Sequence, residues 1–482
     1  MNALKGKREI MYQTKWIVLL AVFFLSYVSF GSIVHFNFAQ DDFTILYYVQ
    51  NNTLLFYPYY VGSLIFIPLY NVFKLNASYY YTVSLLLFIC VGLSLYYFSF
   101  VLFKDKIIAF TAVVFFIFSF AGSDALYTMS VGILMSLFLI LELWTLSFYI
   151  KYQTTKRNKY FYFAFSLYVL ALFLFPYRAY VLLLFILLLY FFVRKKRPTV
   201  LFVKQVFLLI LPYLFVYGLL PYIPFLHTAE HHLPPLFTHL KPESINHVVQ
   251  TIKNVIIPST FSFTTNAAYL IFMLIILIVH KNRRILLPLL FLLIPILGFV
   301  LIFGENYETF DRYLYVIRPF LALFLAALLF CQSSSPQFSF RRLFIIIIIF
   351  PIFLFHTIEN VKYQKEIITD RNYSRYLFNT IRSSHPNIQD YTIFFFNSPD
   401  VPARNRLSRT TDVGALPHSG SFAVYYKKDY EKIGVVFYCD TYASLLETWK
   451  ANSPRTIYFT LQGEKLAEKN LGDTASDCQT IE

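Results

Sequence analysis

Long apolar runs separated by short polar loops recur from residue 16 to residue 357. Several runs reach the roughly 20 residues that a helix needs to cross a bilayer. Loop charge helps to separate neighbouring runs, and together these signals indicate about eleven membrane-spanning helices. The predicted spans are residues 16–34, 78–103, 107–122, 131–150, 160–176, 180–193, 200–222, 261–280, 285–303, 314–331 and 343–357.

The pattern changes after residue 357, where a small α/β domain is predicted. Residues 359–384 have the pattern of a polar helix, and residues 391–397 that of a strand. Further along, the pattern predicts strand, strand, helix and strand, at residues 422–426, 433–439, 444–451 and 456–460. The chain therefore divides into a membrane part, residues 1–357, and a tail, residues 358–482.

Composition supports this division. The 482 residues are 58% hydrophobic, 20% aromatic and only 14% charged, and the mean hydropathy is +0.58. Such values, spread over many separate apolar runs, are typical of a polytopic membrane protein and exclude an ordinary soluble domain.

The net charge of +15 belongs entirely to the membrane part, because the tail holds 15 basic and 15 acidic residues. Alternate loops hold 20 basic residues against Glu9 and Asp105, whereas the intervening loops hold 6 basic and 8 acidic residues. This bias follows the positive-inside rule, so the basic loops are predicted to be cytoplasmic. An odd number of spans then places the N-terminus inside and the tail outside. The charge indicates topology and argues against a nucleic-acid partner.

Two long loops lie on the predicted external side. The first, residues 35–77, has no Lys or Arg before Lys74, and its segment 43–49 is predicted to form a short helix on the membrane surface. The second, residues 223–260, contains several histidines among prolines.

The first external loop carries the main candidate site, the adjacent carboxylates Asp41 and Asp42, directly after the first span. One interpretation is that they cap the surface helix. The other is catalytic: two neighbouring carboxylates can supply a general base and a metal or hydrogen-bond partner, because one charge raises the pKa of the other.

Further external polar residues are candidates for contact with an acceptor or a metal. They are Asp124, Glu305, Glu308 and His231. Asp124 could equally cap a helix. His231 lies close to His227 and His232, but no helical histidine pair with a third ligand marks a zinc site.

Basic residues near membrane depth are candidate phosphate ligands, since an arginine there needs an anionic partner. Arg178 is the strongest, followed by Arg312 and Arg318. Glu142, in the middle of the fourth span, is interpreted as a buried structural residue with a partner rather than a proton relay.

The arrangement resembles the GT-C superfamily of polyprenyl-phosphate-sugar-dependent membrane glycosyltransferases, which includes protein O-mannosyltransferases and lipid A aminoarabinose transferases. The resemblance covers the whole chain as topology. It rests on Asp41-Asp42 with Tyr47-Tyr48 behind it, Pro68-Leu69-Tyr70, Asp124, Arg178 and the external tail. The chain has Asp-Asp where several members have Asp-Glu.

The resemblance implies an inverting transfer of a sugar from a polyprenyl phosphate to a lipid, glycan or protein acceptor. Asp41 is implied as the base, and Arg178 with Arg312 as ligands of the donor phosphate. Some relatives use a divalent metal and others do not, so the cofactor stays open.

Two other function classes remain. An O-antigen-type polysaccharide polymerase or ligase also has about a dozen spans, but would depend on external arginines and histidines. A transporter would need ionisable residues within several spans, and chiefly Glu142 is present. The richness in Phe, Tyr, Ile, Asn and Lys suggests a bacterial inner membrane, and the tail cysteines Cys439 and Cys478 could form a disulfide outside it.

Overall fold

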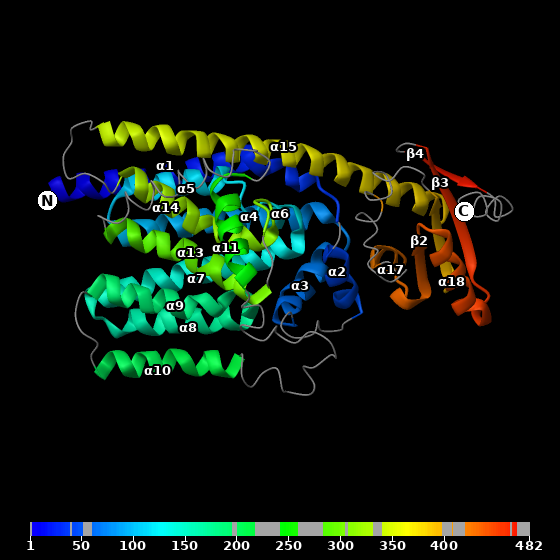
Figure 1. The fold of residues 1–482 in the computed structure, drawn as a ribbon, viewed down its shortest axis with the longest axis horizontal. Coiled ribbons are helices and arrows are strands. Elements are labelled where there is room, and N and C mark those ends of the chain that lie inside the picture. The colour runs from blue at the N-terminus through cyan, green and yellow to red at the C-terminus, as the bar shows by residue number, and fades with distance from the viewer. Residues whose placement is uncertain are drawn as a thin grey trace.

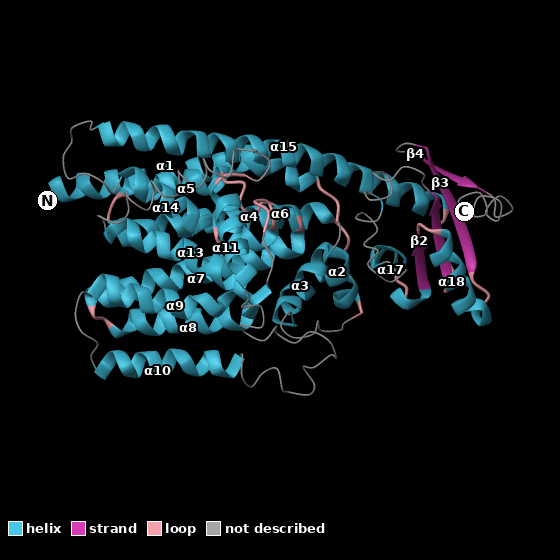
Figure 2. Ribbon diagram, in the orientation of Figure 1, coloured by secondary structure: helices cyan, strands magenta, loops and turns pink. Residues whose placement is uncertain are grey.

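The computed structural model is mostly helical and ends in a small sheet (Figures 1 and 2). It describes residues 2–38, 41–51, 60–194, 200–216, 242–258, 283–303, 307–330, 340–397, 407, 420–462 and 465–469.

The helices of the first part and the long helix that leaves it are α1 (Asn2–Phe30), η1 (Gly31–His35), α2 (Asp41–Gln50), α3 (Tyr60–Phe73), α4 (Ala77–Phe103), α5 (Lys106–Phe118), α6 (Asp124–Tyr127), α7 (Met129–Thr155), α8 (Asn158–Leu174), α9 (Pro176–Arg194), α10 (Val200–Leu214), α11 (Pro242–Ile256), α13 (Arg283–Phe303), η5 (Arg312–Val316), α14 (Arg318–Phe330) and α15 (Phe340–Ser384).

Three described helical segments are long and apolar enough to cross a membrane: Trp16–His35, Ala77–Phe103 and Met129–Thr155. The other predicted spans coincide with the shorter helices α5, α8, α9, α10, α13 and α14 and with the first part of α15. The predicted span 261–280 lies outside the described residues. The prediction of a mainly helical first part is thus confirmed.

Helix α7 lies at the centre of the bundle, packed against α4 and α8, while α5 packs on α4 and α14 (Figure 1). In the most apolar stretch of α7, 67% of the residues are buried inside the structure. In the most apolar stretch of α1 the share is 22%, so α1 lies at the edge of the bundle. Gly132 allows a close approach within this core, because an added Cβ would lie 2.6 Å from Ser84 Oγ.

Helix α15 is one continuous element of 45 residues that joins the bundle to the tail (Figure 1). The separate polar helix predicted at 359–384 is instead the second half of this helix. Residues 352–384 contain neither Gly nor Pro, so no backbone signal ends the helix between them. Gln364 fixes α15 to α1 by donating to the Ser29 carbonyl at 3.1 Å and to Ser32 Oγ at 2.7 Å.

The tail contains a four-stranded mixed sheet in the order β2-β1-β3-β4. Its strands are β1 (Thr392–Asn397), β2 (Ile433–Val436), β3 (Arg455–Gln462) and β4 (Lys465–Lys469). Strand β1 is parallel to β2 and β3, and β4 is antiparallel to β3. The three strands predicted at 391–397, 433–439 and 456–460 correspond to β1, β2 and β3.

The two faces of β1 are buried against different helices, as expected from the alternation of side chains along a strand. Ile393 and Phe395 pack in a cluster with residues of α18 (Cys439–Trp449). Phe394, on the other face, stacks on Phe422 of α17 (Gly420–Tyr426) at 4.3 Å between ring centroids.

Helix α17 corrects the strand predicted at 422–426. Its Phe, Val and Tyr residues favour a strand locally, but burial of Phe422 between the sheet and Phe378 of α15 outweighs that preference. Strand β4 was not predicted, because its side chains are mostly charged and exposed, as befits an edge strand. Cys439 is disulfide-bonded, and the suggested partner Cys478 lies outside the described residues.

Gly122 brings the loop after α5 against the connection before α14. Its φ is +68°, a conformation that favours glycine, and its backbone N–H donates to the Thr309 carbonyl at 2.8 Å. A Cβ at this position would lie 2.1 Å from the backbone nitrogen of Tyr315. This contact between two backbones therefore requires glycine.

Gly122→Ala is expected to lower the free energy of unfolding by at least about 2 kcal/mol, because both the φ and the clash must be relieved. Thermal unfolding of the purified chain in detergent measures this. The matched control is Gly31→Ala, whose Cβ would meet only the Tyr27 ring, at 3.2 Å. Equal melting temperatures for the two variants would contradict the prediction.

In the tail, the Asp390 carboxylate forms ion pairs with the ammonium groups of Lys428, at 2.8 Å, and Lys432, at 3.4 Å. The hydrogen bond from Lys428 is the main cause that lowers the pKa of Asp390. A lowered native pKa means that the stabilisation is present above the unfolded pKa of about 3.9 and is lost as the pH falls through the native pKa.

Asp390→Asn is expected to destabilise the sheet by less than about 1 kcal/mol at neutral pH, since the pair is exposed to solvent. The difference from wild type should disappear at acidic pH. Hydrogen exchange of the β1 amides at several pH values measures it, with the exposed Glu447→Gln as control. A difference that grew on acidification would refute this assignment.

Candidate functional site

The carboxylate pair lies at the N-terminus of α2, where acidic residues interact favourably with the helix dipole. The predicted helix at 43–49 is confirmed as part of α2. Asp41 is the first residue of this helix, and its side chain lies outside the described part of the structure. Asp42 follows it and is fully buried.

Asp42 caps the N-terminus of a different helix, α7. Its Oδ1 accepts hydrogen bonds from the backbone N–H of Ser130 at 3.0 Å and from Ser130 Oγ at 2.9 Å. The N-cap residue of α7, Thr128, makes no side-chain capping bond. A carboxylate from α2 therefore occupies the place of a local cap, where the dipole of α7 favours a negative charge.

The other oxygen of Asp42 faces Tyr81 of α4. The Tyr81 hydroxyl lies 3.2 Å from Asp42 Oδ2, 3.0 Å from the Tyr127 carbonyl and 3.3 Å from the Asn37 carbonyl. A hydroxyl donates a single hydrogen, so these three acceptors compete for it. The arrangement binds α2, α4 and α6 together around one buried carboxylate.

Arg371 brings the long helix α15 into the same cluster. Its Nη2 donates to the Tyr127 carbonyl at 2.6 Å, and the residue is 8% exposed. Its Nε is buried and has no hydrogen-bond partner within the described residues. Arg371 and Tyr81 thus share one acceptor, the Tyr127 carbonyl, and the buried guanidinium keeps one N–H donor unused within the described residues.

A second polar group lies at the first residue of α6. Asp124, the first residue of α6, accepts from the Tyr363 hydroxyl at 3.0 Å, and its backbone N–H donates to the Phe310 carbonyl at 3.0 Å. Burial, with help from the Asp124 carboxylate, raises the pKa of Tyr363. Because the Tyr127 and Tyr363 rings lie 5.6 Å apart, the two groups are neighbours.

The connection before α14 brings more charge to this second group. Burial raises the pKa of Asp311, and the nearby carboxylates of Asp124 and Glu308 reinforce that rise. Two groups lower the pKa of Asp311: the Glu308 backbone N–H, which donates to its carboxylate at 2.7 Å, and the positive charge of Arg312. Glu308 is exposed and Arg312 is half-buried beside the Tyr313 ring. The structure thus brings together the predicted residues Asp124, Glu308 and Arg312.

The remaining predicted residues lie wholly or in part outside the described residues. Arg178 lies in the first turn of α9, and its side chain is outside the described part. The ring of Phe175, just before α9, lies 6.2 Å from Phe138. Phe138 is about 12 Å along α7 from Ser130, taking a rise of about 1.5 Å per residue. The start of α9, which carries Arg178, therefore lies deeper in the bundle than Asp42 does. Glu305 and His231 lie outside the described residues.

Arg318 is fully buried, and two of its three guanidinium nitrogens donate to the backbone, while Nη1 has no hydrogen-bond partner within the described residues. Its guanidinium donates to the carbonyls of Phe116 and Ile117 at 2.7 and 2.8 Å, at the C-terminus of α5. Three phenylalanine rings surround it at 5.2 to 5.4 Å, those of Phe30, Phe88 and Phe116. Two of its nitrogens thus cap the C-terminus of a helix.

Glu142 is 1% exposed, and neither carboxyl oxygen has a hydrogen-bond partner in the described part of the chain. The expected structural partner is therefore not found among those residues.

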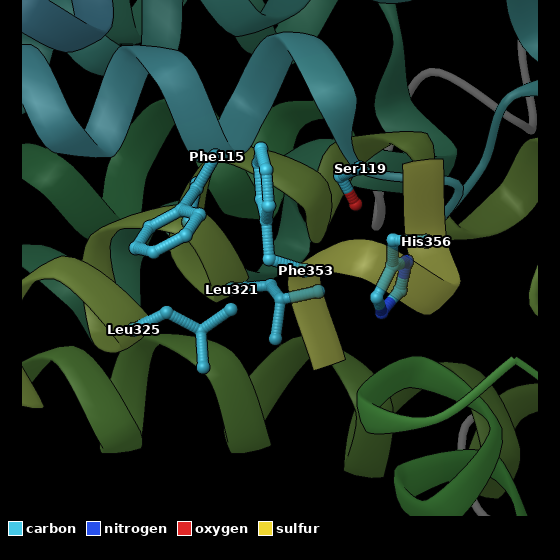
Figure 3. A pocket seen from close by; sticks show the side chains of 7 residues that line it. Phe115, Ser119, Leu321, Leu325, Phe353 and His356 are labelled. Carbon is cyan, nitrogen blue, oxygen red and sulfur yellow. The ribbon is translucent and has the colours of Figure 1, made fainter. Parts of the chain in front are cut away.

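A small cavity lies between α5, α14 and α15, but it is too small for a substrate (Figure 3). Its volume is about 10 Å³, and Phe115, Phe353 and His356 are among the lining side chains. His356 Nδ1 accepts from the Phe120 N–H at 3.0 Å, so Nε2 donates to the Ile256 carbonyl at 3.1 Å. The His356 side chain thus links α15 to the backbone that follows α5 and to the last residue of α11.

Sequence reasoning missed Tyr81, Ser130 and Arg371. Tyr81 lies within a predicted span, Ser130 lies directly before one, and Arg371 lies in the neutral tail, so nothing local distinguishes them. Among the described residues, no group of three His, Cys, Asp or Glu side chains is placed to hold a metal ion. No protein-family model matches the sequence, and no curated protein matches it.

Asp42→Ala is expected to cost about 2–4 kcal/mol of stability, because the Ser130 N–H is left buried without its acceptor. Asp105→Ala is the matched control: Asp105 caps its own helix α5, accepting from the Ile107 N–H at 2.7 Å, and is only half-buried. Its loss should cost about 1 kcal/mol. Thermal unfolding in detergent compares the two, and an equal or smaller effect at Asp42 would contradict the buried cap.

Proposed function

We propose that this protein is an inverting membrane glycosyltransferase of the GT-C type. It takes a sugar from a polyprenyl-phosphate donor and transfers it to a lipid, glycan or protein acceptor on the external membrane face. The single observation that carries the proposal is the buried anchoring of Asp42, which fixes the adjacent Asp41 at the start of α2 beside the N-terminus of α7.

Anchoring of this kind suits a catalytic pair. A general base must be held within hydrogen-bond reach of the proton that it abstracts, and rigid helix termini supply that precision better than a free loop. Here Asp42 has a structural task, which leaves Asp41 as the base of the proposed reaction.

In the proposed step, Asp41 takes the proton of an acceptor hydroxyl as its oxygen attacks the anomeric carbon. The bond from that carbon to the phosphate oxygen breaks, and the polyprenyl phosphate leaves with the bonding electrons and a second negative charge. Arg178 and Arg312 are the proposed ligands of that phosphate, since a guanidinium matches phosphate geometry. Arg371 is a positioning residue that holds the Tyr127 carbonyl and, through it, Tyr81.

The proposal requires a multi-pass arrangement. The N-terminus would be cytoplasmic and the tail external, with the Asp42 cluster at the external end of the bundle. The three helical segments long and apolar enough to cross a membrane support it, as does the division of basic residues between the loops. A bacterial inner membrane is the proposed location.

Asp41→Asn is expected to reduce sugar transfer by at least about a hundredfold, because the amide cannot accept the proton. The measurement is transfer of labelled sugar from a polyprenyl-phosphate donor pool in membranes with matched expression. Asp440→Asn, in the first turn of α18, removes the same charge far from the pair and should leave transfer unchanged.

Arg178→Ala is included to test the phosphate ligand, and unfolding temperatures show that each variant is folded. Full activity of Asp41→Asn, with activity lost only on changes to external arginines or loop histidines, would replace the proposal by the polymerase or ligase alternative.

A further inference from the structure

An exposed apolar stripe runs along the outer face of α15. Its residues recur at spacings of three and four, which places them on one side of the helix. They are Ile347, Phe350, Leu354, Ile358 and Val361, each between 43% and 61% exposed. In a membrane, such a stripe would face lipid chains.

The stripe ends at a pair of lysines. Lys362 and Lys365 follow Val361 on the same helix and are both exposed. Together with Thr357, Ile358, Val361 and Glu366 they line an open groove of about 500 Å³. Within the described residues, neither ammonium group lies within ion-pair distance of a carboxylate. The groove therefore combines an apolar floor with a rim of two lysines and one glutamate, whose net charge is positive.

The depth of this groove follows from α1. Gln364, between the two lysines in sequence, is hydrogen-bonded to Ser29 and Ser32, and the first apolar segment, which covers the end of α1 and η1, ends at His35. Three residues of 3-10 helix correspond to about 6 Å. The lysines accordingly lie close to the level at which the first apolar segment ends, which is the level of lipid headgroups.

We propose that the groove at residues 357–366 of α15 binds the phosphate of an anionic glycerophospholipid, with its acyl chains along the stripe. The inference rests on the membrane insertion proposed above but not on sugar transfer. Two adjacent cations above an apolar surface at interface depth complement such a lipid in both charge and shape. A soluble phosphate would use only the lysines, which are exposed to competing water and salt.

The test uses the full chain in nanodiscs of phosphatidylcholine with a minor fraction of photoactivatable phosphatidylglycerol. Cross-links are located by mass spectrometry of peptides covering residues 357–366. In Lys362→Gln/Lys365→Gln, cross-linking there should fall by about fivefold or more, because the attraction of both lysines is lost. Lys362→Arg/Lys365→Arg keeps the charge and should retain it.

The matched control is Lys465→Gln/Lys469→Gln, on the exposed strand β4, which removes the same charge from the tail. It should leave cross-linking at residues 357–366 unchanged, and added inorganic phosphate at constant ionic strength should not compete.

Three results would overturn the inference. Cross-linking at residues 357–366 could fall equally in Lys362→Gln/Lys365→Gln and in Lys465→Gln/Lys469→Gln, it could fall in neither variant, or inorganic phosphate could displace the lipid probe from the groove. Cross-links elsewhere on the chain with none in the groove would refute this site and leave the glycosyltransferase proposal standing. Absence of cross-links anywhere would instead count against membrane insertion itself.

Discussion

The buried carboxylate of Asp42 is the contact on which the arrangement of the site depends. It joins the start of α2 to the start of α7, a largely buried helix of the bundle, although the two helices are far apart in sequence. A charged group without solvent must find hydrogen-bond donors, and the first turn of a helix offers free N–H groups together with a favourable dipole. The fixed position of α2 is a consequence of this requirement.

Helix α15 supplies the other half of the frame. From its apolar first half onward it contributes His356, Asn360, Tyr363 and Arg371 to the segments around α6. Further along, its Phe378 packs on Phe422 of α17, the helix that covers the sheet. Because one unbroken helix makes all these contacts, the surroundings of Asp42 and the attachment of the tail cannot shift independently. The tail is therefore part of the frame of the site rather than an appendage.

The sequence was sufficient for what periodicity and charge determine locally. Runs of apolar residues predicted the helices, and the continuous run Ile393-Phe394-Phe395-Phe396 predicted β1, a parallel strand that is buried on both faces. The sequence was insufficient where contact with a residue far away along the chain determines the local structure. The pairing of Asp42 with Ser130 spans 88 positions, and that of Arg371 with Tyr127 spans 244. Helix α17 was mistaken for a strand for the same reason, since its contact with Phe394 outweighs local preference.

Two buried arginines show how backbone carbonyls can satisfy a cation without solvent in part. Arg318 uses two carbonyls at the end of α5 and the faces of three phenylalanine rings, and its buried Nη1 has no hydrogen-bond partner within the described residues. Arg371 uses one carbonyl and retains a buried donor. A search for phosphate ligands that weighs only burial and residue type would treat both alike. The number of carbonyls within reach distinguishes them, because a guanidinium held by two carbonyls of a helix terminus gains less from a phosphate than one held by a single carbonyl.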